Sequence, residues 1–184
     1  MTRLHRLLAI AAATLGLGAA ATDYRPSVNV PGERDQISAV ALAERIISRE
    51  PNLRIFDLRS LEEYDQFHIP GSKHAVMTDL TRDSVSPDST VVLYSEDGPR
   101  TTQAWILMRM RGYRNVFFLR EGIYEWISRV HEPRLAIDAT AAERADFERA
   151  AELSRFFGGL PLADVPRPEV STKETIAKIR RRGC

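Results

Sequence analysis

A polar loop at residues 95–101 carries the side chains best placed for chemistry. Its members are Ser95, Glu96, Asp97, Gly98, Pro99, Arg100 and Thr101. The loop follows a continuous apolar run and precedes a segment with helical character. Backbone N–H groups in such a loop converge on its centre, and the positive end of the following helix adds to their field. A nucleophile at Ser95 would project into this cradle, where negative charge developing on it would be stabilised.

The chemistry open to Ser95 is limited by its hydroxyl group. A hydroxyl is far harder to ionise than a thiol, and it needs an adjacent base to act as a nucleophile. The loop contains no histidine, although His68 or His74 could approach it in space. Glu96 and Asp97 place two carboxylates beside the cradle and would oppose an anionic ligand.

The elements around this loop alternate between strand and helix patterns. The run Thr90–Tyr94 is apolar and rich in β-branched residues, which is typical of a strand buried on both faces. Further strands are expected at 53–57, 74–77 and 115–119, and helices at 38–48, 61–67, 101–111 and 122–130. This alternation predicts an α/β fold with an open sheet of mainly parallel strands. Ligands of such sheets bind at the carboxyl ends of the strands, which is where Ser95 lies.

The regions on either side of this unit have a different character. Residues 1–21 combine a basic start, an apolar run and an Ala-Ala-Ala exit, which predicts a secretory signal peptide and a periplasmic or secreted protein. The alternative is an uncleaved anchor helix, the one case in which we expect a membrane contact. Residues 22–35 are predicted to be a linker. Residues 133–184 are predicted to be a helical C-terminal extension, with capping boxes at Thr140–Glu143 and Ser171–Glu174 and an irregular stretch at 160–168.

The composition excludes several classes of function. The formal net charge is +1, so no strong field favours nucleic acid as a partner. We find no metal-ligand spacing, no phosphate-binding P-loop and no dinucleotide fingerprint, and we predict neither a metal nor a cofactor. Cys184 is the single cysteine, which rules out an intramolecular disulfide.

A series of different short motifs follows in order through residues 36–132. They are Phe56-Asp57-Leu58-Arg59-Ser60, Glu62-Glu63-Tyr64, His68-Ile69-Pro70-Gly71-Ser72, Val91-Val92-Leu93-Tyr94-Ser95, Gly98-Pro99-Arg100-Thr101 and Gly112-Tyr113-Arg114-Asn115-Val116, followed by Leu119, Gly122 and Trp126. At this spacing the segment resembles a single-domain rhodanese. It departs from that family at Glu121, where a glycine is usual before Gly122.

The resemblance implies a five-stranded parallel sheet with helices on both faces. It also implies that Ser95 stands where active members have a cysteine, which carries sulfane sulfur as a persulfide. The six-residue loop length, Ser95 to Arg100, is that of the sulfurtransferase branch rather than of its phosphatase relatives. We therefore predict a pseudoenzyme that is not a conventional thiosulfate sulfurtransferase. It would bind an unidentified small ligand or a partner protein at the 95–101 loop.

An alternative function uses the thiol of Cys184. Residues 171–184 hold five basic groups and one acid, and nearby cations lower the pKa of a thiol. In this alternative the tail folds over the Ser95 cradle, drawn by Glu96 and Asp97, and Cys184 acts as the sulfur carrier of a sulfurtransferase or thiol-redox enzyme. The simpler interpretations are an incidental terminal thiol or a mixed disulfide with another protein.

Four further residues are interpreted as support for the loop. Asp57, Arg59 and Glu63 are expected to form a scaffold network, with an Arg59–Glu63 bridge from strand to helix. His68 is expected to be a structural hydrogen-bonding group rather than a base. For Arg100 two interpretations remain open, a ligand contact or an ion pair with Glu96 or Asp97.

Overall fold

The computed structural model describes residues 31–81, 85–96 and 98–167. The predicted signal peptide, most of the linker, the helix expected from Ser171, Asp97 and Cys184 therefore lie outside the described residues. Within the linker range, Glu33–Asp35 forms one turn of 3-10 helix. None of the described helices is both long enough and apolar enough to span a membrane.

The centre of the fold is a five-stranded sheet in which every neighbouring pair is parallel. Its strands are β1 Gln36–Ile37, β2 Leu53–Asp57, β3 Ser72–His74, β4 Thr90–Tyr94 and β5 Val116–Leu119. They are arranged in the order β1-β5-β4-β2-β3, which confirms the predicted open α/β sheet. The third strand begins two residues before the predicted start at 74, because its ladder with β2 starts at the Ile55–Ser72 pair.

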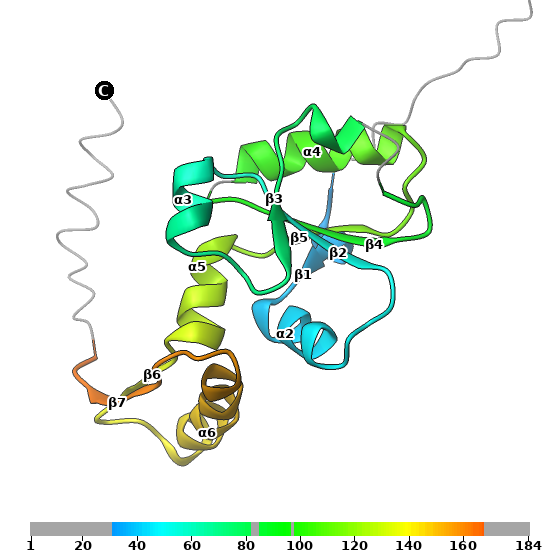
Figure 1. Ribbon diagram of the computed structural model, residues 1–184. Coiled ribbons are helices and arrows are strands. Elements are labelled where there is room, and N and C mark those ends of the chain that lie inside the picture. The colour runs from blue at the N-terminus through cyan, green and yellow to red at the C-terminus, as the bar shows by residue number, and fades with distance from the viewer. Residues whose placement is uncertain (1–30, 82–84, 97, 168–184) are drawn as a thin grey trace, which may run out of the picture.

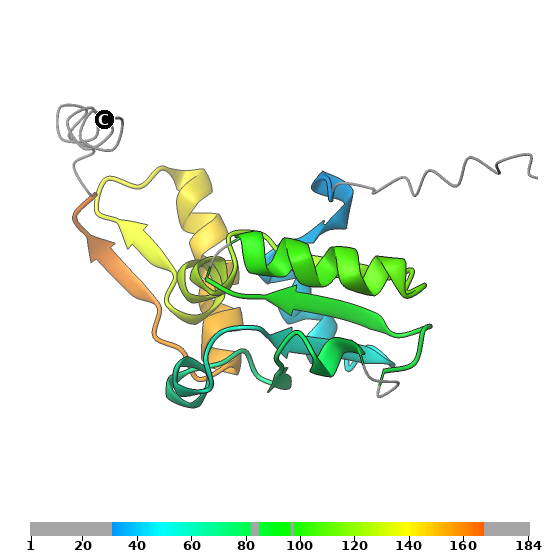
Figure 2. The same ribbon diagram turned by 90° about the horizontal axis from the view of Figure 1, so that it is seen from above.

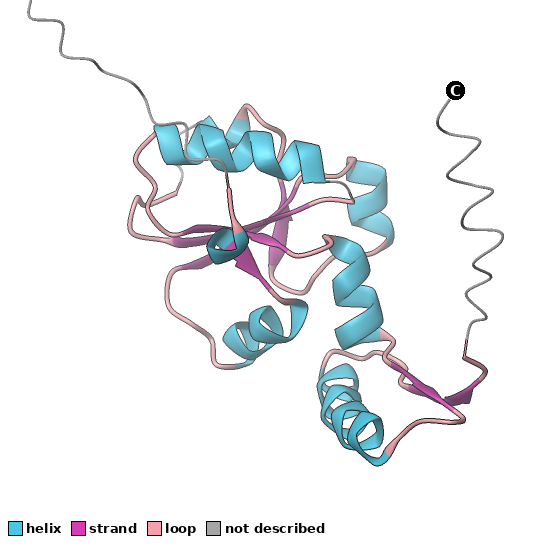
Figure 3. Cartoon of the chain, turned by 180° about the vertical axis from the view of Figure 1, so that it is seen from behind, coloured by secondary structure: helices cyan, strands magenta, loops and turns pink. Residues whose placement is uncertain are grey.

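Helices cover both faces of this sheet (Figure 1). They are α2 Ala39–Ile47, α3 Leu61–Gln66, α4 Gly98–Met110 and α5 Ile123–Trp126, and α5 continues as a π-helical turn over Ile127–His131. One further 3-10 turn lies at Asp79–Thr81. Figure 3 shows α4 on one side of the sheet and α2 on the other. Helix α4 starts at Gly98, three residues earlier than predicted. Pro99 is compatible with this start, because the N–H groups of the first helical turn have no partner within the helix and proline lacks only such a group.

The central strand β4 explains why both faces are covered. Successive side chains of a strand point to opposite faces. Val91 and Leu93 enter a core with α4, whereas Val92 and Tyr94 enter a second core with α2 and α5. All four side chains are fully buried. The continuous apolar run in the sequence therefore follows from the central position of the strand.

The C-terminal extension contains one helix and two short strands. Helix α6 spans Ala141–Phe156, and its predicted capping box between Thr140 and Glu143 is confirmed. Strands β6 Arg134–Ala136 and β7 Leu162–Val165 form a parallel pair beside it (Figure 2). The expectation of irregular structure at 160–168 is wrong for β7. That strand is stabilised by β6, a partner distant in sequence, which local composition does not indicate.

The extension packs on the domain through the last turn of α6. The Phe157 ring meets the buried Trp126 edge-on, with ring centroids 5.1 Å apart. The Ser154 hydroxyl donates to the carbonyl of His131 at 2.7 Å. A Cβ atom at Gly159 would lie 2.1 Å from the same carbonyl oxygen, so this contact requires glycine. The extension thus shares the core of α2 and α5.

The carboxyl edge of the sheet depends on a second close backbone approach. The N–H of Ile123 donates to the carbonyl of Ser95 at 3.0 Å, which joins the start of α5 to the end of β4. A Cβ atom at Gly122 would lie 2.0 Å from that carbonyl oxygen. Gly122 has φ 58° and the preceding Glu121 has φ 51°, so two consecutive residues turn the chain in the left-handed region. This turn sets the position of the Ser95 loop.

The close approach predicts an unequal effect of alanine at two glycines. Gly122→Ala should lower the free energy of unfolding by about 2–4 kcal/mol, because it adds a steric conflict to backbone strain. Gly112→Ala should cost only about 1 kcal/mol, since Gly112 also has φ above zero but no atom lies within 4 Å of its Cβ position. Guanidinium chloride unfolding measures both. Equal losses would show that the Gly122–Ser95 contact is not tight.

A buried carboxylate links α5 to the start of α2. Glu125 is 9% exposed, and it accepts a hydrogen bond from the N–H of Ala39 at 3.2 Å. Burial raises the pKa of Glu125, and the hydrogen bond from Ala39 only partly offsets this effect. The folded state therefore favours the neutral acid relative to the unfolded chain.

The raised pKa of Glu125 predicts a pH-dependent stability. The contribution of Glu125 is present below the unfolded pKa and is lost as the pH rises through its folded pKa. Glu125→Gln should therefore become more stable relative to the unsubstituted protein between about pH 4 and about pH 7. Urea unfolding at the two pH values measures this trend. Glu44→Gln, an exposed site on α2, is the control, and a trend no steeper than in that control would contradict the assignment.

Candidate functional site

The loop after β4 forms the centre of the candidate site. Ser95 is 1% exposed, and its carbonyl bonds to Ile123 as described above. Thr101 is buried in the first turn of α4 and donates from its hydroxyl to the carbonyl of Gly98 at 3.0 Å. On the side of β2, the N–H of Leu58 bonds to the carbonyl of Tyr94 at 2.9 Å. The carboxyl end of β4 is therefore held by the segment after β2 at Tyr94 and by α5 at Ser95, and α4 begins at Gly98.

The outer side of the loop is acidic. Glu96 is exposed and accepts a hydrogen bond from the Tyr124 hydroxyl at 3.2 Å. This hydrogen bond, followed by the charge of Glu96, raises the pKa of Tyr124. The sequence did not indicate this contact, because nothing local reveals a partner 28 residues away.

Glu63 on α3 belongs to the same acidic surface. Hydrogen bonds from the hydroxyl and then the N–H of Ser60 lower the pKa of Glu63, whose side chain lies beside that of Glu96. The reciprocal bonds between Ser60 and Glu63 form the capping box of α3 that the sequence predicted. Glu63 therefore begins the helix and also adds negative charge beside the loop.

The ion pair beneath the loop has a different partner from the one expected. Arg59 pairs with Asp57 rather than bridging to Glu63, and its Nη2 lies 2.6 Å from the Asp57 carboxylate. Both residues are buried, and the Arg59 Nε adds bonds to the two carboxylate oxygens at 3.0 and 3.1 Å. Burial acts to lower the pKa of Arg59, but the bonds and charge of Asp57 outweigh it and raise that pKa. Glu63 is instead satisfied by its cap.

Tyr94 is a site residue that the sequence did not indicate. Its hydroxyl accepts from the N–H of Ile69 at 3.2 Å and bonds the Ser72 hydroxyl at 2.9 Å. Burial raises its pKa, which keeps the phenol neutral. The Arg59 guanidinium lies 5.8 Å from the ring centroid. Tyr94 was predicted only as the last residue of a strand, yet it joins the strand end to the turn at 69–72.

The two histidines near this edge bond to the backbone. His68 places Nδ1 2.9 Å from the carbonyl of Tyr64, and its ring stacks on the Tyr64 ring with centroids 4.0 Å apart. His74 places Nε2 3.0 Å from the carbonyl of Arg59. These contacts support the interpretation of His68 as a structural group.

A cleft of about 400 Å³ opens between β2, α3 and α4. Arg100 lies on its wall and donates to the carbonyl of Leu58 at 2.9 Å, which was neither of the two contacts considered from the sequence. The lining residues are Leu58, Arg59, Ser60, Glu63, Ala75, Val76, Met77, Arg100 and Gln103. Within the described parts of the chain, no group of three or more His, Cys, Asp or Glu side chains is placed to hold a metal ion.

Comparisons with known proteins show which proteins the chain is similar to. The chain is 27% identical over 93 residues to the YrkF protein of Bacillus subtilis, whose name describes a sulfur carrier. The match covers 50% of this chain and 50% of that protein, so the chain spans about half the length of this relative. It is 30% identical over 94 residues to a sulfurtransferase of Allochromatium vinosum, with 50% of this chain and 87% of that protein covered. The solution structure of a rhodanese-like domain from an Anabaena protein matches with a TM-score of 0.45 and 27% identity, covering 50% of this chain and 72% of that one.

The match to a family model has the same extent. The model of the rhodanese-like domain aligns with residues 38–129, half of the sequence. This range runs from the N-cap of α2 to the π-helical turn and includes the whole loop after β4. The chain therefore belongs to the rhodanese-like domain family.

Proposed function

We propose that this protein is a rhodanese-like binding module that lacks persulfide-based sulfurtransferase activity. One observation carries the proposal, namely that the residue enclosed at the carboxyl end of β4 is Ser95, a hydroxyl. Sulfur transfer by a rhodanese-type loop requires a thiolate that breaks the sulfur–sulfur bond of the donor and keeps the sulfane sulfur as a persulfide. A serine oxygen cannot store sulfur in that form, and the single cysteine of the chain is Cys184.

The charges around the loop support a ligand other than an anion. Glu96 and Glu63 lie on the outer side of the loop, and Tyr124 donates its hydroxyl to Glu96. A dianion such as thiosulfate would be repelled at this surface. A neutral ligand, or a cationic side chain of a partner protein, meets the carboxylates favourably. The proposed ligand is therefore a neutral or cationic group.

Export remains part of the proposal. The basic, apolar and small-residue segments of residues 1–21 support secretion to the periplasm or the medium. In that setting the module would meet its ligand or partner outside the cytoplasm.

A second candidate function assigns sulfur transfer to Cys184. It is favoured by the acidic surface of the loop, because residues 171–184 carry a net charge of +4 and would be attracted to Glu63 and Glu96. The thiolate of Cys184 would attack the donor sulfur, release sulfite from thiosulfate and hold the sulfane sulfur as a persulfide.

The first prediction for this proposal concerns sulfur loading of the unsubstituted chain. We expect no protein-bound sulfane sulfur after incubation with thiosulfate, because the loop lacks a thiol. Cyanolysis of the isolated protein measures such sulfur directly. Cys184→Ser is the matched variant. Loading that disappears in Cys184→Ser would favour the second candidate, whereas loading that persists in it would refute the assignment of chemistry to thiols.

The next prediction tests whether the cradle keeps its shape. Ser95→Cys should acquire measurable sulfur loading, since the strand end, the start of α4 and the contact with Ile123 are all in place. Adding Glu96→Gln should accelerate loading by thiosulfate roughly fivefold at low salt, because one repulsive charge is removed.

Charge removal far from the loop provides the control for that variant. Glu148→Gln on α6, combined with Ser95→Cys, should leave the loading rate unchanged. An inert Ser95→Cys protein that still unfolds cooperatively would show that the loop lacks more than its thiol.

A further inference from the structure

A groove of about 650 Å³ runs between α2 and α6. The two helices lie on the same side of the sheet in Figure 1. Three of the lining side chains are large, apolar and exposed, namely Val40 at 37%, Ile47 at 38% and Phe156 at 63%. Apolar side chains gathered in a groove in this way mark a surface suited to a partner segment.

The edges of the groove carry three acidic residues, Glu44, Asp146 and Glu152, and two basic ones, Arg129 and Arg149. Arg149 pairs with Asp146 on the surface of α6. Glu44 on α2 and Glu152 on α6 form no ion pair with any other residue that the structure describes. A basic amphipathic segment would therefore complement both the floor and the edges of the groove.

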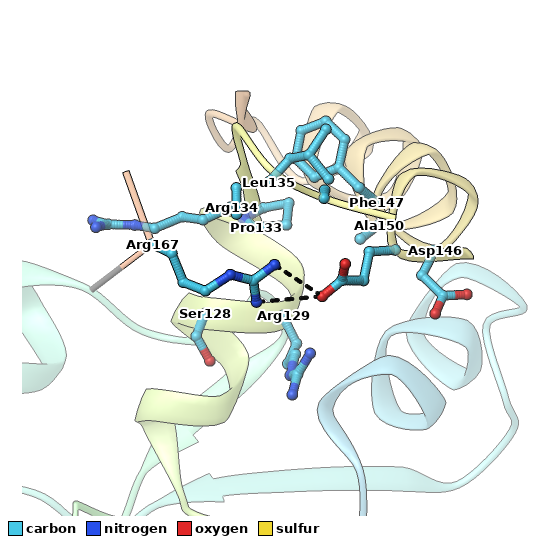
Figure 4. Close-up of a pocket in the computed structure, with 12 residues that line it drawn as sticks. Ser128, Arg129, Pro133, Arg134, Leu135, Asp146, Phe147, Ala150 and Arg167 are labelled. Carbon is cyan, nitrogen blue, oxygen red and sulfur yellow. Dashed lines mark hydrogen bonds and ion pairs between the residues drawn. The ribbon is translucent and has the colours of Figure 1, made fainter. Parts of the chain in front are cut away.

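The described chain ends beside this groove. Arg167, the last described residue, bonds to the carboxylate of Asp138 and to that of Glu143 in the first turn of α6. Figure 4 shows the Arg167 guanidinium directed at a carboxylate of α6, with dashed lines between them. The hollow of about 240 Å³ that Arg167 lines shares Arg129, Asp146 and Ala150 with the groove. Arg167 thus fixes the start of the remaining chain near the Asp146 end of the groove.

The seventeen residues that follow have a suitable pattern and length. The sequence predicts a helix from the capping box at Ser171, in which Ile176 and Ile179 share one face. A helix over residues 171–182 would be roughly 18 Å long, and the α6 wall from Asp146 to Phe156 is roughly 15 Å long. Residues 171–184 also carry five basic groups against one acid.

We propose that residues 168–184 dock as an amphipathic helix in the groove between α2 and α6. Ile176 and Ile179 cover the apolar floor formed by Val40, Ile47 and Phe156. The basic side chains lie along the edges that hold Glu44 and Glu152. The inference does not depend on the leading proposal for the Ser95 loop, and it competes with the second candidate, in which the same residues cover that loop. It makes the C-terminal extension the docking site of the tail.

The single cysteine allows a direct test on the full chain. A nitroxide label on Cys184 broadens the NMR signals of nearby amide groups in the ¹⁵N-labelled protein. We expect a loss of peak intensity in α6 and α2, strongest near Phe156, which is reversed when the label is reduced. Intact signals along the groove would overturn the proposal, and so would broadening centred on the 95–101 loop.

One further measurement excludes a second copy of the chain as the occupant. In this experiment, nitroxide-labelled chains without ¹⁵N are mixed with ¹⁵N-labelled chains that carry no nitroxide. The ¹⁵N signals of the mixture should show no broadening. Broadening in that mixture would mean that a second copy of the chain fills the groove, which overturns docking within one chain. Full intensity in the mixture supports it.

Matched variants tie the signal to the groove. Phe156→Ser should abolish the broadening, whereas Leu160→Ser should keep it, since Leu160 is 68% exposed on the same extension but does not line the groove. Ile179→Glu should also abolish it, and this position lies outside the described residues. Retention of the broadening in both Phe156→Ser and Ile179→Glu would overturn the proposed contact.

Discussion

The buried ion pair between Asp57 and Arg59 organises the carboxyl edge of the sheet. Removing two charges from water is costly unless each is paired and fully hydrogen-bonded. Here both carboxylate oxygens face the guanidinium, and the remaining Arg59 bond goes to the carbonyl of Phe67 at the end of α3. The Arg59 carbonyl meets His74 at the end of β3, and the guanidinium lies over the ring of Tyr94. One residue thus connects three strand ends and a helix.

The surface above this edge carries different side chains from the scaffold beneath it. Beneath the loop, the buried Arg59 guanidinium is held by Asp57, and the hydroxyls of Tyr94 and Ser72 bond to each other. At the outer side, Glu63 and Glu96 add negative charge and Tyr124 a hydroxyl. The geometry of a strand end facing a helix start is therefore present, while the charges beside it oppose an anionic donor. Such a separation of scaffold from chemistry is common, because function depends on a few side chains placed on a fold.

The extension enlarges the domain without altering its sheet. Phe157 packs beside Trp126 in the core of α2 and α5, and the bond from Ser154 to His131 fixes the end of α6. Because the contact surface is the face of the sheet opposite α4, the extension leaves the cleft between α3 and α4 open. The same contact brings α6 alongside α2 and creates the apolar groove between them.

Features with a local cause were predictable from the sequence. The buried strand Thr90–Tyr94, the N-cap at Ser38 and the capping boxes at Ser60 and Thr140 all follow from residues within a few positions of one another. The alternation of these elements was sufficient to predict a parallel α/β sheet with a loop at Ser95 on its carboxyl edge.

Only the tertiary structure decided the contacts between distant residues. It paired Arg59 with Asp57 although Glu63 is also nearby in sequence, brought Tyr124 to Glu96, and placed β7 beside β6. Each outcome depends on which elements become neighbours once the two cores are packed. Periodicity and capping signals describe one element at a time, so they determine where helices and strands form, whereas packing determines which of their side chains meet.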